Sequence, residues 1–354
     1  MTHPVRASDY MDHRPLAIDR DINLWENHGW MVWDRVDEED VLLWLSPYRL
    51  VGGQPDGPFA VQDVALSQTL VLRAAHAGGE RRIMHDNPFL EVGYELGDHQ
   101  PGNALSIDLE PDRATWRIGQ RSFEAQPPRW RIVGEHAGVD VDLEMQAMGP
   151  ALWLTPPERS VEQIEERWLV QCARARGEVR HRGRTLRIDG YACHERHVHC
   201  GTRYDPPRLL SARGVTWHSG SSEGVQVLIL SRPSLGLVWA RLVFENAEVE
   251  FSAPSHTCKL EETDFWLDPQ SRLQVPCAWE STFTGPSGQL HVSARAFARA
   301  YYLWPNFKRG CTILYWWLAD AEVSYTLADG RSASATFQYI VHDNRLLYRQ
   351  HLDD

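Results

Sequence analysis

The chain has 354 residues, of which 24% are charged and 43% hydrophobic, as in a soluble globular protein with one large domain or two ordinary ones. Its net charge of −12 disfavours partners such as nucleic acid or an anionic membrane, and no apolar run approaches the ~20 residues of a membrane-spanning helix. The N-terminus lacks the apolar core of a secretion signal, and the six Cys are widely scattered. We therefore expect a cytoplasmic protein with reduced thiols.

The first half of the chain shows short strand patterns separated by turn signals. Residues 1–22 are polar and contain Pro4 and Pro15, so we expect a loosely held arm. The segment 139–146 alternates between apolar and polar side chains, which is typical of a half-buried strand. Gly149-Pro150 and Pro156-Pro157 then break the pattern, and we predict a domain boundary near residue 160.

The second half repeats this strand-and-turn pattern, and residues 294–302 are its only plausible helix. Strand signals about every ten residues favour sandwiches or barrels over βαβ units. We therefore predict an all-β fold with few short helices. Two antiparallel β-barrel domains, residues 23–160 and 161–354, are expected to pack side by side.

One segment of the second half carries an unusual set of polar residues. Cys193–Cys200 reads CHERHVHC, with three His and one Glu. In a strand, Glu195, His197 and His199 share one face, and His194 lies on the other face with Arg196 and Val198. A carboxylate can orient a neighbouring imidazole and stabilise its protonated form, and imidazole exchanges protons near neutral pH.

We predict that Glu195, His197 and His199 transfer protons in an active site. His194 is a further candidate because it is adjacent to them in sequence. Tyr204 and Asp205 are candidates as well, because they follow the strand at an expected barrel rim.

Two other interpretations of this segment remain open. Two His and one carboxylate suit a non-haem iron site, although ligands at alternate positions of one strand fan out too far to close on one ion without help. The imidazoles could also be polar groups on a solvent-facing strand. The sequence has no phosphate-binding loop, nucleophile elbow, Cys-x-x-Cys pair or dinucleotide fingerprint, so we predict neither a cofactor nor a metal.

Aromatic residues are abundant, with 15 Trp in the chain. Such rings fill a β-core, line a cavity for an extended apolar ligand, or stabilise a carbocation. The candidates for substrate binding are Trp217, Tyr301, Trp304, Tyr315, Trp316 and Trp317.

Several motifs resemble a known superfamily. They are Pro128-Arg-Trp130-Arg-Ile132, Val139–Glu144, Pro150–Trp153, Gly177-Glu-Val179, Gly183, Gly190-Tyr191, His194-Glu195 and Gly201-Thr-Arg203. The chain resembles the tandem lipocalin-like proteins, which include carotenoid hydratases (hydroxyneurosporene synthases), AttH-like proteins and fungal decalin-forming Diels–Alderases. It departs from them at His199-Cys200-Gly201, where the relatives usually carry His-x-Trp-Gly or Ser-Trp-Gly.

This resemblance implies two lipocalin-like (calycin-type) barrels and a pocket for an apolar polyene, isoprenoid or polyketide. In the hydratases an acid protonates an alkene and water quenches the cation; in the cyclases the pocket mainly folds the substrate. We therefore predict a cofactor-independent lyase or isomerase, of hydratase or cyclase type, with its cavity between the domains. The alternatives are a non-catalytic binding protein for a hydrophobic small molecule and a metal enzyme. The oligomeric state is left open.

Overall fold

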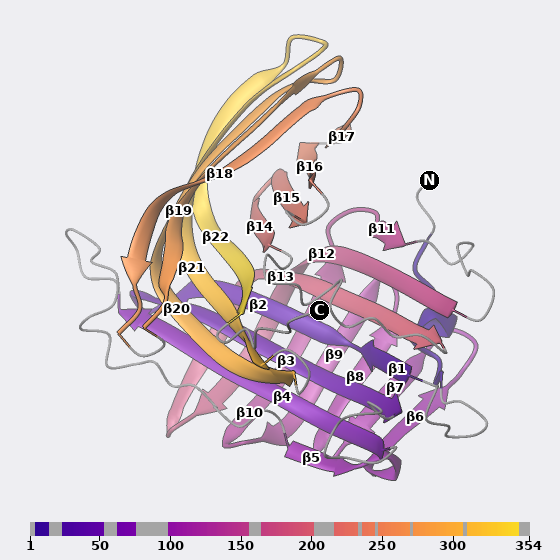
Figure 1. Ribbon diagram of the computed structural model, residues 1–354. Coiled ribbons are helices and arrows are strands. Elements are labelled where there is room, and N and C mark those ends of the chain that lie inside the picture. The colour runs from indigo at the N-terminus through magenta and orange to yellow at the C-terminus, as the bar shows by residue number, and fades with distance from the viewer. Residues whose placement is uncertain are drawn as a thin grey trace, which may run out of the picture. The chain divides into compact units, whose positions relative to one another are not determined.

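The computed structural model describes residues 4–13, 23–52, 62–75, 98–155, 164–201, 216–232, 236–244, 247–269, 272–306 and 310–346 (Figure 1). These residues form β-strands almost throughout, which confirms the predicted all-β class. None of the described helices has the length and hydrophobicity that a membrane span requires.

In the first part of the chain, the described residues form thirteen strands and two short 3₁₀ helices. Their bounds are η1 Ala7–Tyr10, β1 Asn23–Asn27, β2 Gly29–Val36, β3 Glu39–Gly52, β4 Gln62–Ala75, β5 Asp98–Pro101, η2 Gly102–Ala104, β6 Leu105–Leu109, β7 Ala114–Ile118, β8 Arg121–Gln126, β9 Arg129–His136, β10 Val139–Ala147, β11 Leu152–Thr155, β12 Ile164–His181 and β13 Arg184–Gly201.

The remaining nine strands form a separate sheet. Their bounds are β14 Thr216–Ser222, β15 Val225–Arg232, β16 Leu237–Phe244, β17 Ala247–Ser252, β18 Thr257–Leu267, β19 Gln274–Gly285, β20 Gly288–Asn306, β21 Gly310–Leu327 and β22 Ser332–Leu346.

The first sheet is antiparallel and has the order β5-β4-β3-β1-β13-β12-β10-β9-β8-β7-β6, with β11 added beside β12. Strands β1 and β2 both lie between β3 and β13, and the single residue His28 separates them. β13 is thus central, with β12 on one side and the interrupted β1–β2 strand on the other. This position brings residues from both ends of the first unit to the predicted active-site strand.

The second sheet has the order β17-β16-β15-β14-β22-β21-β20-β19-β18. All its neighbours are consecutive in sequence except β14 and β22, so it is an up-and-down meander in which β14 also pairs with the final strand. The edge strands β17 and β18 contact each other, which shows that the sheet curls round on itself. The two barrel-like sheets agree with the predicted all-β fold class.

The chain divides into two compact units, one of residues 1–73 and 91–204 and the other of residues 74–90 and 205–354. The boundary expected near residue 160 falls inside the first unit. β12 pairs with β10 from Val139↔His181 to Ala147↔Ala173, and then with β13 along its full length. Because these ladders continue the first sheet, the His-rich strand belongs to the first unit and not to the second.

Of two local secondary-structure predictions, one is confirmed and the other is wrong. The alternation at 139–146 correctly marks β10, whose apolar residues Val139, Val141, Leu143 and Met145 are buried. The helix expected at 294–302 is instead part of β20. Alanine favours helices, but here Ala294, Ala296, Ala298 and Ala300 are all buried in the sheet, so packing overrides their helix propensity.

The N-terminal segment is packed into the first unit, contrary to the loosely held arm expected from its composition. Tyr10 is fully buried in the core that β2, β7 and β9 line with Trp30, Trp116 and Trp130. The backbone carbonyl of Tyr10 accepts a hydrogen bond from the Trp116 indole at 2.8 Å. Residues 14–22 of the expected arm lie outside the described residues.

Candidate functional site

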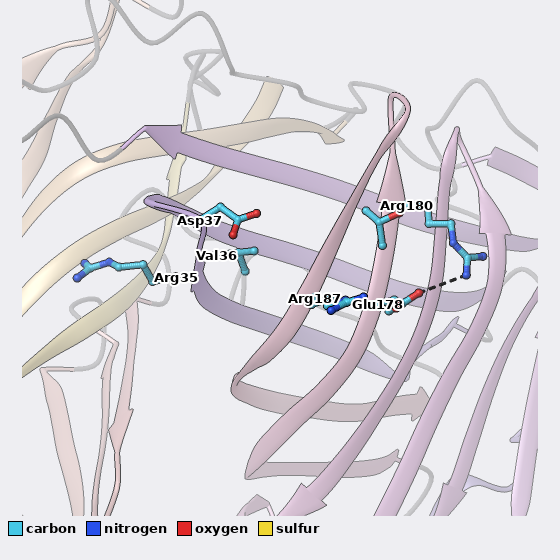
Figure 2. Close-up of a pocket in the computed structure, with 7 residues that line it drawn as sticks. Arg35, Val36, Asp37, Glu178, Arg180 and Arg187 are labelled. Atoms are coloured by element: carbon cyan, nitrogen blue, oxygen red, sulfur yellow. Dashed lines mark hydrogen bonds and ion pairs between the residues drawn. The ribbon is translucent and has the colours of Figure 1, made fainter.

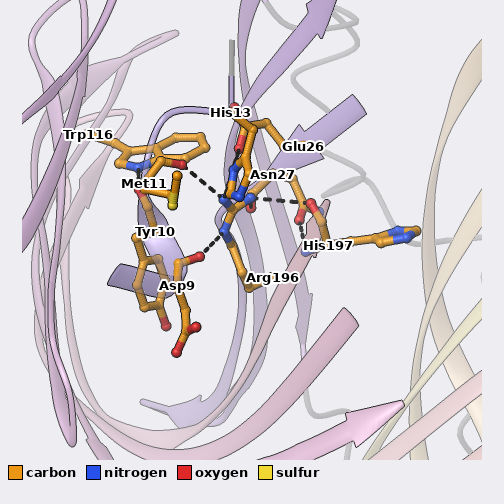
Figure 3. A network of polar contacts seen from close by, with 9 residues as sticks. All are labelled: Asp9, Tyr10, Met11, His13, Glu26, Asn27, Trp116, Arg196 and His197. Carbon is orange, nitrogen blue, oxygen red and sulfur yellow. Dashed lines mark hydrogen bonds and ion pairs between the residues drawn. The ribbon is translucent and has the colours of Figure 1, made fainter. Parts of the chain in front are cut away.

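β13 presents two chemically different faces, as its alternation predicted. His194 and Arg196 point into the barrel core, where their neighbours include Tyr10 and Trp116. Glu195 and His197 lie on the opposite face, which Figure 3 shows for His197, whose ring points away from the Arg196 network. The side chain of His199 lies outside the described residues.

Asn27, at the end of β1, links Glu195 to His197. Its Nδ2 donates to Glu195 Oε2 at 3.0 Å, and its Oδ1 accepts from the backbone N–H of His197 at 2.8 Å. The amide is fully buried and so holds both residues in one arrangement. A residue from another strand thus contacts both the Glu195 carboxylate and the His197 backbone.

Burial raises the pKa of the Glu195 carboxyl to about 7, while hydrogen bonds from Asn27 and Trp168 oppose this rise by stabilising the charged form. A carboxyl with this pKa exists in both protonation states near neutral pH. It can therefore act as a general acid or a general base, which an ordinary glutamate cannot do equally well.

Two indole rings flank the His197 imidazole. Trp168 of β12 stacks on it at 5.1 Å between ring centroids, and Trp25 of β1 meets it edge-on at 4.6 Å. Tyr48 of β3 lies 5.7 Å from Trp25 and extends this aromatic wall. Such π-faces bind apolar surface and stabilise nearby positive charge. We call Asn27, Glu195, His197, Trp25 and Trp168 the outer-face site.

On the inner face, His194 has a fixed tautomer. Its Nδ1 lies 2.7 Å from the carbonyl oxygen of Gly29, which can only accept, so Nδ1 carries the proton. Nε2 therefore accepts from the Tyr10 hydroxyl at 2.9 Å, and this hydroxyl in turn accepts from the Trp130 indole at 2.9 Å. Burial lowers the pKa of His194 to about 3, so this imidazole is neutral and supports the core.

Arg196 joins the N-terminal segment to β1 and β13 (Figure 3). Its Nη2 donates to Glu26 Oε2 at 2.8 Å and its Nη1 to the Asn27 carbonyl at 2.9 Å. Its Nε donates to the carbonyl of Asp9 at 3.0 Å. Glu26 also lies 3.0 Å from His13 Nδ1, and its pKa is lowered because the charges of Arg196 and His13, with their hydrogen bonds, outweigh burial.

His28 is a second buried imidazole that the sequence analysis missed. It lies at the break between β1 and β2, 4.7 Å from the Tyr10 ring and 4.9 Å from the His194 ring. Burial lowers its pKa well below the ordinary value. Among the described residues, neither of its ring nitrogens has a hydrogen-bond partner.

The sequence did carry a signal for these missed residues. Glu26, Asn27 and His28 are three consecutive polar residues within an otherwise apolar strand pattern. All three are fully buried in the structure. Polar groups in an apolar run are costly to bury without partners, so such an interruption indicates a special site.

The structure describes only some of the other predicted site residues. Tyr204, Asp205 and the side chain of Trp304 lie outside the described residues. The remaining aromatic candidates belong to the second sheet, on β14, β20 and β21: Trp217, Tyr301, Tyr315, Trp316 and Trp317.

Within β21, the three consecutive aromatic residues divide between the two faces. Tyr315 and Trp317 belong to the core cluster, and the Tyr315 hydroxyl donates to Asp268 at 2.8 Å. Trp316 points to the opposite face and stacks on His342 at 3.9 Å between ring centroids. The three therefore cannot line one cavity wall together.

Among the side chains that the structure describes, no group of three or more His, Cys, Asp or Glu could hold a metal ion. The side chain of His199 is not among them, so the arrangement predicted for Glu195, His197 and His199 stays a prediction.

An open, charged groove lies elsewhere on the first unit (Figure 2). Its volume is about 810 Å³, and its walls come from the β2–β3 turn and the β12–β13 hairpin. Glu178 in this groove lies 3.3 Å from Arg180 and 3.8 Å from Arg187. A polar groove with internally paired charges does not suit the apolar ligand that the aromatic wall would bind.

No protein-family model matches the sequence, and no curated protein matches it. Solved structures do resemble the fold. CghA is 13% identical, with 99% of this chain and 94% of CghA covered and a TM-score of 0.53. The CghA complex with Sch210972 is 12% identical, with 93% and 89% covered and a TM-score of 0.51.

A protein assigned to AttH from Nitrosomonas europaea is 11% identical, with 94% of this chain and 98% of that protein covered and a TM-score of 0.50. The fold is thus shared along nearly the whole length of each chain. The resemblance predicted from the sequence is confirmed at the level of the fold.

Proposed function

We propose that this protein is a cofactor-independent enzyme of lyase or isomerase type that acts on an apolar terpenoid, polyene or polyketide substrate. The observation that carries this proposal is the Glu195 carboxyl, whose pKa of about 7 is set by burial and opposed by the Asn27 amide. It lies on the same strand face as the His197 imidazole, which two indole rings flank. Side chains that can exchange protons and side chains that can bind apolar surface are thus neighbours.

In the proposed reaction, protonated Glu195 donates its proton to an alkene or enol carbon of the substrate. The electron pair of the double bond forms the new C–H bond, and a carbocation or its carbonyl equivalent results. Asn27 and Trp168 stabilise the glutamate anion left behind. The faces of Trp25 and Trp168 stabilise the cation. General acid catalysis of this kind contributes about 10²–10⁴-fold in rate.

The second step determines the reaction type. Addition of water to the cation gives a hydratase, whereas attack by an internal double bond and loss of a proton gives a cyclase. His197 is our candidate for the base that accepts this proton, and His199 remains a candidate by its position on the strand. His194 is assigned a positioning role, because its neutral ring is hydrogen-bonded within the core.

Fold-level similarity gives limited support, since one fold hosts many functions. CghA, which has a similar fold, holds the small molecule Sch210972 in its complex. The function proposed for this chain therefore depends on its own residues, above all on Glu195.

The test compares Glu195→Gln and His197→Phe with the wild type. Acyclic terpenoids and linear polyketide polyenes are incubated with each protein in H₂O and D₂O, and products are separated by liquid chromatography and mass spectrometry. Hydration adds the mass of one water, and cyclisation leaves the mass unchanged. We expect Glu195→Gln to lose about 10²-fold or more in turnover while retaining retinol binding, measured by fluorescence.

Glu178→Gln is the matched control, because it removes an exposed carboxyl on the neighbouring strand. It should leave turnover unchanged. If the wild type binds panel compounds but converts none, or if Glu195→Gln is fully active, the enzyme proposal is wrong. If binding were then lost only when Trp25 or Trp168 is replaced, the protein would be a carrier of such compounds.

A further inference from the structure

The barrel of the second unit contains a connected cluster of buried aromatic side chains. His218 of β14 lies 5.7 Å from the Tyr339 ring and 5.6 Å from the Trp279 ring, between centroids. Trp279 lies 5.9 Å from Trp317. Four strands thus bring these four residues together inside one barrel. We call them the calyx cluster.

The polar atoms of the calyx cluster are left without partners. Among the described residues, no hydrogen bond reaches either ring nitrogen of His218, the hydroxyl of Tyr339, or the indole nitrogens of Trp279 and Trp317. Each of these side chains is at most 1% exposed. An unsatisfied buried polar group costs about 1–3 kcal/mol, and native proteins contain few of them.

The same barrel satisfies another aromatic hydroxyl in full. The hydroxyl of Tyr315, next to Trp317 in ring contact, donates to Asp268 at 2.8 Å, and Arg299 donates to the same carboxylate at 2.5 Å. In the calyx cluster, by contrast, five such atoms without partners lie on four neighbouring side chains. Their concentration at one place indicates that something outside the chain supplies their partners.

The donors and acceptors of the calyx cluster define what would bind there. Two indole N–H groups, one phenol and one imidazole N–H can donate, so the ligand must offer acceptor oxygens. Burial lowers the pKa of His218 to about 3 and raises that of Tyr339 far above its ordinary value, so the cluster carries no charge. A charged ligand would find no counter-ion among these four residues.

Small side chains lie opposite the large ones. Ala294 is the cross-strand partner of Trp279, and Ala319 is that of Tyr339. The inward-facing alanines of this core are Ala240, Ala294, Ala296, Ala319 and Ala321. In a small barrel, the sizes of the paired inward-facing side chains determine how much of the interior these side chains fill.

We propose that the second barrel binds a neutral, largely apolar small molecule carrying carbonyl or hydroxyl oxygens, which accept hydrogen bonds from Tyr339, Trp279, Trp317 and His218. This site consists only of residues from the second unit, whereas Glu195 lies in the first. It therefore does not depend on the proposed catalytic function.

The test uses the full chain and two matched neutral probes. Benzophenone carries one carbonyl, and diphenylmethane has the same two rings without it. Binding is followed by quenching of Trp fluorescence. We expect benzophenone to bind at least about fivefold more tightly than diphenylmethane, the difference expected for one hydrogen bond. Irradiation of bound benzophenone should cross-link it to peptides from β14, β19, β21 or β22.

The variant Tyr339→Phe removes only the hydroxyl oxygen. It should weaken benzophenone binding about fivefold and leave diphenylmethane binding unchanged. Trp316→Phe is the control, because Trp316 lies on the opposite face of β21. The proposal is overturned if both probes bind equally, if neither binds because water alone fills the barrel, or if the cross-links lie only outside the second unit. Cross-linking uses the wild type and does not depend on the variant's folding.

Discussion

At the scale of single residues, the environment of one carboxyl group determines what the first unit can do. Glu195 follows His194 directly in sequence, yet the two side chains experience opposite constraints. His194 is held neutral by burial, with both ring nitrogens hydrogen-bonded. Glu195 contacts a buried amide and an indole, and its pKa of about 7 allows proton exchange. Strand alternation alone separates these two roles.

The raised pKa of Glu195 predicts a specific pH dependence of stability. The folded pKa of about 7 exceeds the ordinary value of 4.5, so the folded state binds more protons between these pH values. The contribution of Glu195 is therefore fully present below pH 4.5 and is lost as the pH rises through about 7. Glu195→Gln cannot titrate, so its unfolding temperature relative to wild type should rise between pH 5 and pH 8. An identical difference at both values would contradict the assigned pKa.

Asn27 should act as a positioning residue for this carboxyl. Asn27→Leu removes the N–H that favours the charged form of Glu195, so the pKa of Glu195 should rise above its present value. A carbon-13 NMR titration of labelled Glu side chains measures this shift. A resonance that is absent from the double variant Asn27→Leu, Glu195→Gln is assigned to Glu195. An unchanged or lowered pKa would contradict the role assigned to Asn27.

At the scale of elements, one arginine of β13 joins the N-terminal segment to the barrel. Arg196 contacts the carbonyls of Asp9 and Asn27 and the carboxylate of Glu26, all in the interior. A buried ion pair contributes little net stability, but removing one partner leaves a buried charge without compensation. The Arg196 side chain therefore couples the N-terminal segment, β1 and β13.

Replacing Arg196 should reveal this coupling. Arg196→Met should lower the free energy of unfolding by about 3–5 kcal/mol, because the buried charge of Glu26 then loses its guanidinium partner and, among the described residues, keeps only the His13 contact. Denaturant unfolding measures the loss, and adding Glu26→Gln should restore part of it. Arg295→Met breaks an exposed ion pair with Asp264 and should cost no more than about 1 kcal/mol. Equal losses for the two arginine variants would argue against a special role of Arg196.

At the scale of the whole molecule, the two sheets divide the chain at Tyr204 and not at the proline-rich break near residue 160. The ladder between β10 and β12 crosses that break, so the first sheet is incomplete without β12 and β13. A strand that loses its neighbour exposes unpaired backbone groups and apolar side chains.

This division predicts how fragments of the chain behave. A fragment ending at residue 204 should resist protease digestion better than one ending at residue 160, because only the longer fragment retains the partners of β10 and β11. Limited proteolysis at equal concentration compares the two. If the shorter fragment were equally resistant, β12 and β13 would not be integral to the first unit.

The sequence by itself determined the strand content, the two faces of β13 and the half-buried alternation of β10. These features follow from a period of two residues, which is a local property. The helix expected at 294–302 failed because residue propensity is also local, whereas the sheet that overrides it is assembled from distant strands.

Only the tertiary structure decided which face of β13 points into the core and which residues of other strands lie beside the candidate site. Asn27 and Trp168 come from two other strands, and Tyr10 contacts His194 across 184 positions of sequence. Alternation shows that a strand has two sides, but not which side faces the core or what packs on it. Contacts between distant segments set the pKa of Glu195, because burial and hydrogen-bond partners exist only once the chain has folded.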